Sequence, residues 1–373
     1  MIIGIPKEIK VQEDRVAITP SGVKLLIKNN HKIIIERSAG IGSGYSDEDY
    51  AKSGAVIIDN AADLYNQADM IFKVKELCSS ELKFLKKHQI LISFMHLVVE
   101  KAMTDALLEK KVSAVALETI EDTNGVTPLL RPMGEIAGKK SIQIAANLLE
   151  NHNGGSGIMM GGMPGVEACK VLIIGAGNVG FFAAKTAANM GANVSLLDIN
   201  IEKLRYAHDV LGSNVKTYLS DEDIIRNLIK DADAVIGAVL IPGHKPPCLI
   251  TEDMVKSMKK GSVIVDVSID QGGIAETEDR ITTLDNPFYD KFGVLHYCVP
   301  NIPGCVARTA SPAFANESLK YVKEIADFGF IEAVKRDKAL AKGVNTYKGK
   351  LTNKGVALAF GMEYTELPSI IGF

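Results

Sequence analysis

The chain has 373 residues, of which 47% are hydrophobic and 23% are charged, and its formal net charge at pH 7 is −3. This length predicts two domains, each with enough apolar side chains to form a core. The near-balanced charge and the lack of a long basic run argue against nucleic acid as a partner, because phosphate binding needs clustered Lys and Arg.

The first residues and the cysteines bear on the compartment. In MIIGIPKEIK the charges arrive by residue 7, so we expect no signal peptide. No stretch reaches the roughly 18 uncharged apolar residues of a membrane span, so we expect no membrane association. The odd number of cysteines and the lack of a CxxC pair indicate reduced thiols in a cytoplasmic protein. These are Cys78, Cys169, Cys248, Cys298 and Cys305.

The first part of the chain alternates short Val/Ile-rich runs with segments of helical period, which predicts βαβ units and a parallel sheet. Strands are expected at residues 32–36, 55–59, 70–75, 89–96 and 112–118. Helices are expected at residues 21–30 and 100–111, the first with Ser21 as its N-cap because it directly follows Pro20.

A helical stretch at 134–152 and a glycine-rich loop at 153–165 lead to a second tract of the same rhythm, which begins near Lys170. Its six strands and intervening helices match the doubly wound dinucleotide fold. These strands are expected at residues 170–175, 194–198, 215–220, 232–240, 262–269 and 294–299.

After residue 310 the pattern becomes helical, mainly over 312–336, and this tail is too short for a third domain. We therefore expect it to pack back on the first domain, which makes that domain discontinuous. The predicted fold class is α/β, with two doubly wound domains: a Rossmann dinucleotide-binding domain and a discontinuous Rossmann-like substrate domain. The substrate domain is assigned residues 1–130 and 306–373, and the Rossmann domain is assigned residues 131–305.

The segment VLIIGAGNVG carries the glycine pattern GxGxxG at Gly175, Gly177 and Gly180, between an apolar strand and a helical segment. This context predicts dinucleotide binding. Gly175 allows the tight turn, Gly177 lets the backbone approach a pyrophosphate, and Gly180 lets the helix pack on the strand. Backbone N–H groups and the helix dipole then hold the phosphates.

Asp198 closes the next strand, 18 residues after Gly180, where an acid accepts hydrogen bonds from the adenosine ribose. A carboxylate there repels a 2′-phosphate, so we expect NAD rather than NADP as the cofactor. Lys203 lies one turn into the following helix and is a candidate for the purine pocket, although it reads equally well as an ordinary surface lysine.

The first domain must supply the substrate site. In open α/β sheets the ligands lie beyond the carboxyl ends of the strands. Two consecutive predicted strands end in ionisable residues, Lys75 and His96, and strand alternation puts Lys73 on the same face as Lys75. Lys75 alone reads as a surface lysine and His96 alone as a packing residue, but together they predict a polar pocket. Arg15 is a further candidate, with a surface ion pair to a neighbouring acid as the alternative.

Several segments occur in an order that resembles the alanine dehydrogenase family and, less closely, the soluble subunits of nicotinamide nucleotide transhydrogenases. They are GIPKEIKVQEDRVAITPSGV, KVKE, FMHL, VLIIGAGNVG, LLDIN and DVSIDQGG. The resemblance extends from Met1 to about Ala341, and the opening segment and DVSIDQGG are its most specific parts. It implies L-alanine and pyruvate as substrates, NAD as cofactor and, in most members, a homo-hexamer.

Roles carried over from the resemblance fall on five candidates. Arg15 would grip the substrate carboxylate by two parallel hydrogen bonds. Lys75 would hold the carboxylate or the carbonyl oxygen of pyruvate, and His96 would act as acid or base at that oxygen, since its ordinary pKa of about 6.5 suits proton exchange near neutral pH. Met133 and Ile302 would form apolar walls that exclude water. These roles require groups from both domains around the nicotinamide ring.

The segment SVIVDVSIDQGG holds two aspartates in what reads as a buried strand, where unpartnered carboxylates are rare. We interpret Asp266, inside the strand, as structural and hydrogen-bonded to nearby backbone or loop amides. Asp270 is expected to close the strand at the nicotinamide end of the crevice. The resemblance makes Asp270 catalytic: it would orient the attacking water and assist proton transfer on the imine and carbinolamine.

The family also implies further cofactor contacts along the second domain. Beyond the three glycines, Asp198 and Lys203, they are Gly134, Asn178, Val179, Ser220, Val239, Leu240, Val267, Ser268, Ile269, Asp270, Arg280, Val299, Asn301 and Ile302.

The sequence departs from the family pattern at four positions. Gly134 stands where many relatives carry serine, so a hydroxyl contact to the pyrophosphate would be missing. Pro300 and Ala307 occupy positions where alanine and proline are expected, which affects loop shape. Phe328 replaces a histidine that binds a metal in some relatives, and we therefore expect no metal even though Glu118 is present.

Two alternatives remain open beside an alanine dehydrogenase. One is a transhydrogenase-type NAD(H)-binding subunit, which needs membrane partner chains and does not deaminate alanine. The joint presence of Arg15, Lys75 and His96 argues against it. The other is a non-catalytic NAD-binding regulator, which would tolerate the loss of His96 and Asp270.

Overall fold

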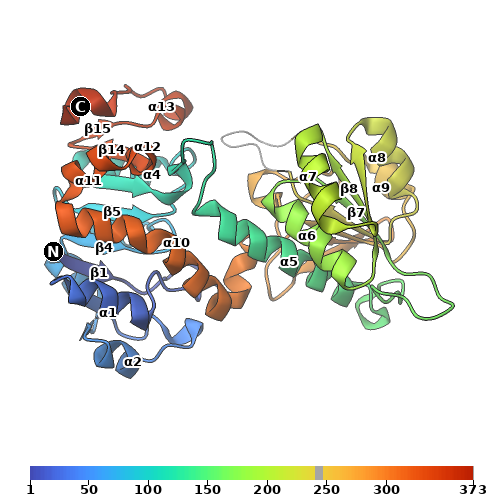
Figure 1. The fold of residues 1–373 in the computed structure, drawn as a ribbon, viewed down its shortest axis with the longest axis horizontal. Coiled ribbons are helices and arrows are strands. Elements are labelled where there is room, and N and C mark those ends of the chain that lie inside the picture. The colour runs from blue at the N-terminus through green and yellow to red at the C-terminus, as the bar shows by residue number, and fades with distance from the viewer. Residues whose placement is uncertain (240–246, 373) are drawn as a thin grey trace. The chain divides into compact units, whose positions relative to one another are not determined.

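The computed structural model describes residues 1–239 and 247–372, and the chain divides into two compact units. Unit 1 combines Met1–Met133 with Gly304–Phe373, and unit 2 is Gly134–Pro303. Each unit is built on a sheet flanked by helices, so the predicted α/β class with two doubly wound domains is confirmed (Figure 1).

Unit 1 contains an eight-stranded sheet within the described residues, in the order β15-β14-β6-β5-β4-β1-β2-β3. Strands β1 to β6 run parallel to one another, whereas β14 runs antiparallel to β6 and β15 antiparallel to β14. The strands are β1 Ile2–Ile5, β2 Lys32–Glu36, β3 Val56–Ile58, β4 Met70–Phe72, β5 Ile90–Ser93, β6 Ser113–Ala116, β14 Val344–Tyr347 and β15 Lys350–Leu351.

The first helix of unit 1 corrects one prediction. Helix α1 (Pro20–Lys28) is capped by Thr19, whose side chain accepts the N–H of Gly22, so the predicted cap Ser21 is wrong. The reason is that proline favours the first helical position, which moves the cap one residue before it. The other helices are α2 Asp47–Lys52, α3 Ala61–Gln67, α4 Lys101–Glu109, α10 Ala307–Phe328, α11 Phe330–Arg336, α12 Lys338–Gly343, α13 Lys354–Phe360 and α14 Leu367–Ile371.

The C-terminal segment joins unit 1 through apolar packing. In α10 the ring of Phe314 is fully buried and stacks on Phe72 of β4, with ring centroids 5.8 Å apart. It also packs against Phe94, which follows β5, at 5.7 Å. Aromatic pairs at these distances bury large areas and fix their neighbours. The tail therefore covers the centre of the unit 1 sheet.

Unit 2 contains a seven-stranded sheet among the described residues, in the order β12-β13-β11-β10-β7-β8-β9. All its strands are parallel except β12, which pairs antiparallel with β13 at one edge. The strands are β7 Lys170–Ile174, β8 Asn193–Asp198, β9 Val215–Leu219, β10 Ala234–Gly237, β11 Val263–Asp266, β12 Phe288–Lys291 and β13 Val294–Tyr297.

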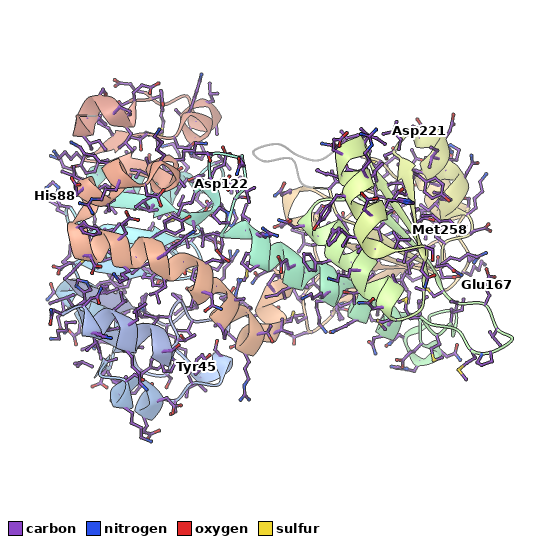
Figure 2. All side chains as sticks on the ribbon, viewed as in Figure 1. Tyr45, His88, Asp122, Glu167, Asp221 and Met258 are labelled. Carbon is purple, nitrogen blue, oxygen red and sulfur yellow. The ribbon has the colours of Figure 1, made fainter. Side chains whose placement is uncertain are left out.

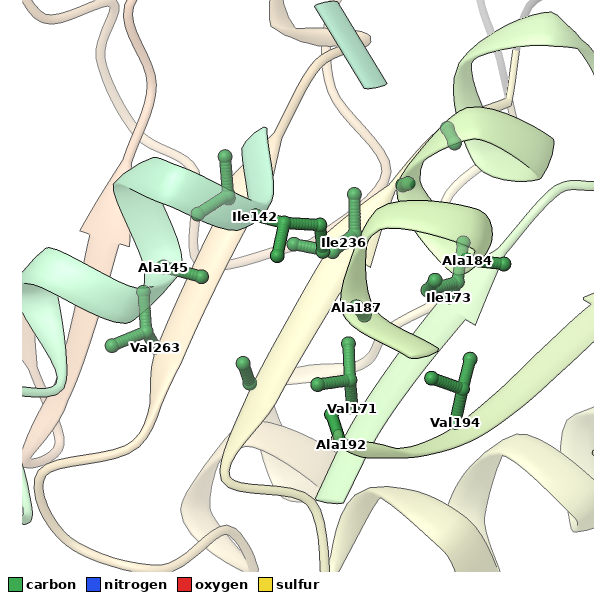
Figure 3. Close-up of a cluster of buried hydrophobic side chains, with 14 of the residues drawn as sticks. Ile142, Ala145, Val171, Ile173, Ala184, Ala187, Ala192, Val194, Ile236 and Val263 are labelled. Carbon is green, nitrogen blue, oxygen red and sulfur yellow. The ribbon is translucent and has the colours of Figure 1, made fainter. Parts of the chain in front are cut away.

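Alternate side chains of each strand point to opposite faces of the unit 2 sheet, and both faces are buried. Val171 and Ile173 of β7 belong to one buried cluster, while Leu172 and Ile174 belong to the other. Figure 3 shows the first cluster, in which alanines of α6 and residues of α5 cover β7, β10 and β11. The helices are α5 Leu130–Leu148, α6 Asn178–Asn189, α7 Ile201–Leu211, α8 Glu222–Ile229 and α9 Glu252–Lys256.

The strands are mostly shorter than predicted at their carboxyl ends, and this affects the site. β4 ends at Phe72 instead of residue 75, β5 ends at Ser93 instead of residue 96, and β11 ends at Asp266 instead of residue 269. The predicted end of the 232–240 strand, residue 240, lies outside the described residues. The candidate residues Lys75, His96 and Asp270 therefore lie in loops beyond the strands.

Figure 2 gives two reference points for unit 1. His88 lies just before β5, at the amino end of the strands, and Asp122 follows β6 at their carboxyl end. Across residues 1–239 and 247–372, none of the helices has the length and apolar character that crossing a membrane requires.

Candidate functional site

The glycine loop of unit 2 joins β7 to α6, and each glycine has its own steric reason. Gly175 has φ +104°, and a Cβ there would lie 2.4 Å from the carbonyl oxygen of Ala238. A Cβ on Gly180 would lie 1.7 Å from the carbonyl oxygen of Gly175. A Cβ on Gly177 would meet no atom within 4 Å. Two glycines thus serve close packing, and the third leaves open space beside the backbone.

The amino end of α6 suits a phosphate. Its N-cap, Gly177, provides no side-chain hydrogen bond to the first turn, which consists of Asn178, Val179 and Gly180. The N–H groups of a first turn carry partial positive charge and point along the axis, so they can bind an anion. Gly134 of α5 lies against this turn, because a Cβ on it would be 3.2 Å from Cβ of Asn178. The structure thus brings Gly134, Asn178 and Val179 together beside the glycine loop.

Asp198, at the end of β8, is buried and ties two backbone segments together. Its Oδ2 accepts the N–H of Ala176 at 2.7 Å, and its Oδ1 accepts the N–H of Asn200 at 2.8 Å. The Nζ of Lys203 lies 3.6 Å from Oδ2, and the lysine side chain is about half exposed. Each carboxylate oxygen has two lone pairs, so Asp198 can still accept hydrogen bonds from a ribose.

The remaining cofactor candidates mostly follow parallel strands of unit 2 and therefore share the carboxyl edge of its sheet. Ser220 follows β9 and donates its N–H to the carbonyl of Asp198 at 3.0 Å. Val239 follows β10, and Leu240 lies outside the described residues. The others follow β11 or β13 and are Val267, Ser268, Ile269, Asp270, Val299, Asn301 and Ile302.

Three of the cofactor candidates, Val299, Ile302 and Arg280, have distinct surroundings. Val299 and Ile302 are buried in the apolar cluster of unit 2, so they contribute packing next to the carboxyl edge. Arg280 instead stacks on the ring of Tyr289 in edge strand β12, 4.0 Å from its centroid, and bonds to Asp279. These contacts give Arg280 partners at the edge strand, and its contact with a cofactor stays a prediction.

The two aspartates of the β11 segment have different environments. Asp266 is fully buried, with Oδ1 accepting the N–H of Ser268 at 2.7 Å and Oδ2 accepting the N–H of Ile274 at 2.8 Å. The predicted structural role of Asp266 is therefore confirmed. Contrary to the prediction, Asp270 does not close the strand but lies exposed in the 3-10 turn Ile269–Gln271. The reason is that the Asp266 carboxylate folds the chain back directly after β11.

In unit 1, Arg15 is buried and forms an ion pair with Glu13. Nε and Nη2 of Arg15 donate to the two oxygens of Glu13 at 2.6 and 2.5 Å, and Nη1 donates to Sδ of Met133 at 3.2 Å. The alternative interpretation of Arg15, a surface ion pair with a neighbouring acid, is right about the partner. It is wrong about the location, because the pair is buried. A substrate carboxylate that Arg15 grips in two-point fashion would have to approach from the Nη1 side.

Lys73 and Lys75 do not share one strand face, because β4 ends before both. Lys73 is fully buried, and its Nζ donates to Glu81 at 2.7 and 2.9 Å and lies 3.4 Å from Glu8. Lys75 is more accessible, and its Nζ lies 3.8 Å from Glu76. A lysine with two buried carboxylate partners is a structural cation, so Lys75 is the one of the pair suited to a ligand.

His96 lies in the loop after β5 and has φ +48°, in the left-handed region that is uncommon for residues other than glycine. Burial, together with the positive charges of Lys75 and Lys10, lowers the pKa of His96 to about 4. The imidazole is therefore neutral near pH 7, a state that can accept a proton. The expectation that His96 titrates near neutral pH is wrong, because the loop withdraws it from water beside two cations.

Apart from Glu13, a neighbouring acid of Arg15, sequence reasoning missed the acids that hold these basic groups. Glu8, Glu13, Glu76 and Glu81 pair with lysines or Arg15, and Glu118 accepts backbone N–H groups of the His96 loop. Glu8 and Glu118 each come shortly after a predicted or actual strand. An acid at the end of a strand had already marked Asp198 as a candidate. The same signal could have identified Glu8 and Glu118. Within the described residues, no group of three or more His, Cys, Asp or Glu side chains is arranged to hold a metal ion.

The doubly wound unit 2 sheet, the glycine loop and the buried acid at the end of β8 define the class of the protein: a dinucleotide-binding α/β protein of the oxidoreductase type. The particular family follows from comparison with known proteins. Residues 4–137 match the family model for the N-terminal domain of alanine dehydrogenase/PNT, and residues 141–354 match the model for the C-terminal domain. The chain belongs to the alanine dehydrogenase/PNT family.

Individual proteins give the same result. The chain is 51% identical to an alanine dehydrogenase of Methanococcus maripaludis over 365 residues, which covers 98% of both chains. Its structure is similar to that of an L-alanine dehydrogenase, with a TM-score of 0.93, 43% identity and coverage of 97% and 99% of the two chains. It is less similar to a transhydrogenase from Sinorhizobium meliloti, with a TM-score of 0.83, 26% identity and coverage of 94% and 100%.

Proposed function

We propose that this protein is an L-alanine dehydrogenase, which reversibly converts L-alanine, NAD⁺ and water to pyruvate, ammonium, NADH and a proton. The observation that carries the proposal is that Lys75 and a neutral His96 lie in neighbouring loops at the carboxyl edge of the unit 1 sheet, in a chain that also has a dinucleotide loop. The similarity to alanine dehydrogenases over nearly the whole chain supports it.

In this proposal the basic groups of unit 1 bind the substrate. Arg15 donates to the carboxylate of alanine from its Nη1 side, while Glu13 keeps the guanidinium in place. Lys75 donates to the carboxylate or to the carbonyl oxygen of pyruvate. The thioether of Met133, which contacts Arg15, supplies an apolar wall that excludes water.

His96 and Asp270 carry the proton transfers. Because His96 is neutral near pH 7, it accepts the proton from the carbinolamine hydroxyl as the carbonyl of pyruvate forms, and it returns that proton in the reverse direction. Asp270 orients the water that adds to the imine and assists transfer of its proton to the departing amine. Bringing reacting groups to about 3–3.5 Å contributes much of the acceleration in reactions of this kind.

The cofactor is NAD, which supplies the hydride acceptor when bound. The residues of unit 2 fit it: the first turn of α6 would hold the pyrophosphate, and Asp198 would accept hydrogen bonds from the adenosine ribose. The carboxylate disfavours the 2′-phosphate of NADP. Gly134 adds no hydroxyl but lies close to this turn, so backbone N–H groups would carry the phosphate contacts.

The test is an assay of purified protein with L-alanine and NAD⁺, in which NADH absorbance is followed at alkaline pH. We expect turnover in the wild type, and we expect His96→Ala and Asp270→Asn to abolish turnover while circular dichroism stays unchanged. Either variant with near wild-type kcat would remove that residue from the mechanism.

The same assay separates the alternatives. A transhydrogenase-type subunit and a non-catalytic regulator would both bind NAD without any production of NADH from alanine. The similarity to the Sinorhizobium meliloti transhydrogenase is the reason for testing the transhydrogenase-type alternative. NAD binding in the absence of alanine-dependent NADH would refute the proposed dehydrogenase.

We further propose a cytoplasmic homo-hexamer, as in most members of the family that the sequence resembles. Light scattering coupled to size exclusion is expected to give about six times the chain mass of 40.1 kDa. A mass of one or two chains at assay concentration would contradict the hexamer without affecting the proposed reaction.

A further inference from the structure

A buried carboxylate holds the loop that carries Lys75. Glu8 follows β1 and is 7% exposed. Its Oε1 accepts the N–H groups of Val74 and Lys75 at 2.7 and 3.2 Å. Its Oε2 lies 3.4 Å from Nζ of Lys73, which is also bonded to Glu81. The backbone of Lys75 is thus fixed by a buried carboxyl group that reaches it from the segment after β1.

A second carboxylate holds the loop that carries His96 in the same way. Glu118 lies in the turn that follows β6. Its Oε1 accepts the N–H of His96 at 2.7 Å, and Met95 donates its N–H to Oε1 and Oε2 at 3.2 and 3.1 Å. Burial raises the pKa of Glu118, and its three contacts with backbone N–H groups anchor this loop.

The two anchors occupy equivalent places. Lys75 is the third residue after the end of β4, and His96 is the third residue after the end of β5. In both loops the second and third N–H groups beyond the strand point to one glutamate. Since β4 and β5 are adjacent and parallel, the two glutamates set the positions of two neighbouring loops relative to one sheet.

His96 needs such an anchor because of its backbone conformation. At φ +48° a residue with a Cβ is strained, and such conformations persist only where surrounding contacts impose them. The N–H of His96 donates to Glu118 at 2.7 Å, and its carbonyl oxygen accepts the N–H of Val99 at 3.0 Å, so Glu118 supplies a side-chain contact to this residue's backbone. Loss of the acceptor would let the loop relax and would move the imidazole.

We propose that Glu8 and Glu118 are positioning residues of the reaction, Glu8 for Lys75 and Glu118 for His96. Neither acts on the substrate itself, and the inference rests on the proposed function, in which Lys75 binds the substrate and His96 transfers protons. Glu8 therefore acts mainly on the KM for alanine, and Glu118 acts mainly on kcat.

The test compares glutamine and leucine variants at both sites. Glu118→Leu is expected to lower kcat about 100-fold, the order of loss that a displacement of about 1 Å causes, with the KM for alanine changed less than about threefold. Glu8→Leu is expected to raise that KM about tenfold or more, with a smaller effect on kcat. Glutamine keeps one acceptor oxygen, so Glu118→Gln and Glu8→Gln are expected to recover part of each loss.

Asp69→Asn is the matched control. Asp69 precedes β4 and accepts the N–H of Ile2 at 2.7 Å, so it makes the same kind of bond at the opposite end of the same strand. We expect this variant to keep kcat and KM within about twofold of wild type. Thermal unfolding of every variant shows whether it is folded at the assay temperature.

The outcomes distinguish this inference from the proposed function. A wild-type protein that does not oxidise alanine refutes the function, and this inference with it. An active wild type with Glu118→Leu at kcat within twofold overturns the positioning role alone, as do variants whose only change is a lower melting temperature. If the leucine variants fail to fold, the glutamine variants decide: unchanged kinetic constants in both overturn the proposal.

Discussion

At the level of single residues, the environment of His96 determines its chemistry more than its residue type does. Burial comes first among the causes that lower its pKa, and Lys75 comes second. The same lysine that would bind the substrate therefore keeps the imidazole neutral. Binding of a negatively charged carboxylate at Lys75 would offset part of that charge, so His96 would become a better base when substrate is present.

We predict that Lys75→Met raises the pKa of His96, because it removes the positive charge that opposes protonation of the ring. The measurement is the pH dependence of carbethoxylation by diethyl pyrocarbonate, which modifies only neutral imidazole, with His96→Ala to identify the signal among the seven histidines. The wild-type rate should stay level down to about pH 5, whereas the variant should slow as the solution becomes acidic. Identical profiles would show that Lys75 does not act on His96.

Asp198 supports a second prediction at this scale. Asp198→Gly should shift the ratio of kcat/KM toward NADP, since it removes the carboxylate that opposes a 2′-phosphate. Because Asp198 also accepts the N–H groups of Ala176 and Asn200, the variant should lose about 2 kcal/mol of unfolding free energy, measured by urea denaturation. An unchanged cofactor ratio would argue against the ribose role, whatever the loss of stability.

At the level of elements, the sequence predicted the parts that follow from periodicity and failed at the parts set by side-chain contacts. The Val/Ile runs located the predicted strands, and the GxGxxG pattern located the β7–α6 loop. Strands β1, β12, β14 and β15 were missed. Length is not the reason, because β4 and β5 are as short and were found; β12, β14 and β15 each contain at most one Val or Ile, so they lack the signal that marked the others.

The loop geometry of the site could not be predicted for a physical reason. Strand ends are fixed by acids that come from elsewhere in the chain, as Glu8 does for the Lys75 loop, 66 and 67 residues away in sequence. No local pattern encodes such a contact. The residue types were found, but the neutral state of His96 and the ion pair of Arg15 depend on burial that only the fold creates.

The glycine loop offers a prediction that separates packing from ligand contact. Gly180→Ala should destabilise the protein, because its Cβ would lie 1.7 Å from the carbonyl oxygen of Gly175 and would push α6 off the sheet. Gly177→Ala should fold normally, since its Cβ meets no atom within 4 Å, yet it should weaken NAD binding by filling the space a pyrophosphate needs. Calorimetric titration with NAD and thermal melting measure both effects. Equal melting temperatures for the two variants would contradict the assignment.

At the level of the whole molecule, the carboxyl edge of unit 2 contains a pair of acids that links folding to pH. Oδ2 of Asp266 and Oε2 of Glu278 both accept the N–H of Ile274, at 2.8 and 3.0 Å. Two carboxylates this close in a dry environment cannot both be ionised at low cost. Burial, with the charge of Asp266 second, raises the pKa of Glu278 to about 9 from its ordinary 4.5.

The sign of the effect on stability follows from where the proton is held. Between about pH 4.5 and 9 the folded protein keeps a proton on Glu278 that the unfolded chain has released. The stabilisation is fully present below about pH 4.5 and is lost as the pH rises through about 9, by at most about 1.4 kcal/mol per pH unit. We predict that Glu278→Gln, which keeps an acceptor for Ile274 but cannot ionise, loses less unfolding free energy than the wild type as the pH rises. Urea unfolding of both proteins at pH 6, 7, 8 and 9 measures it. Parallel curves would mean that Glu278 is ionised in the folded protein, and that the turn after β11 is held without a shared proton.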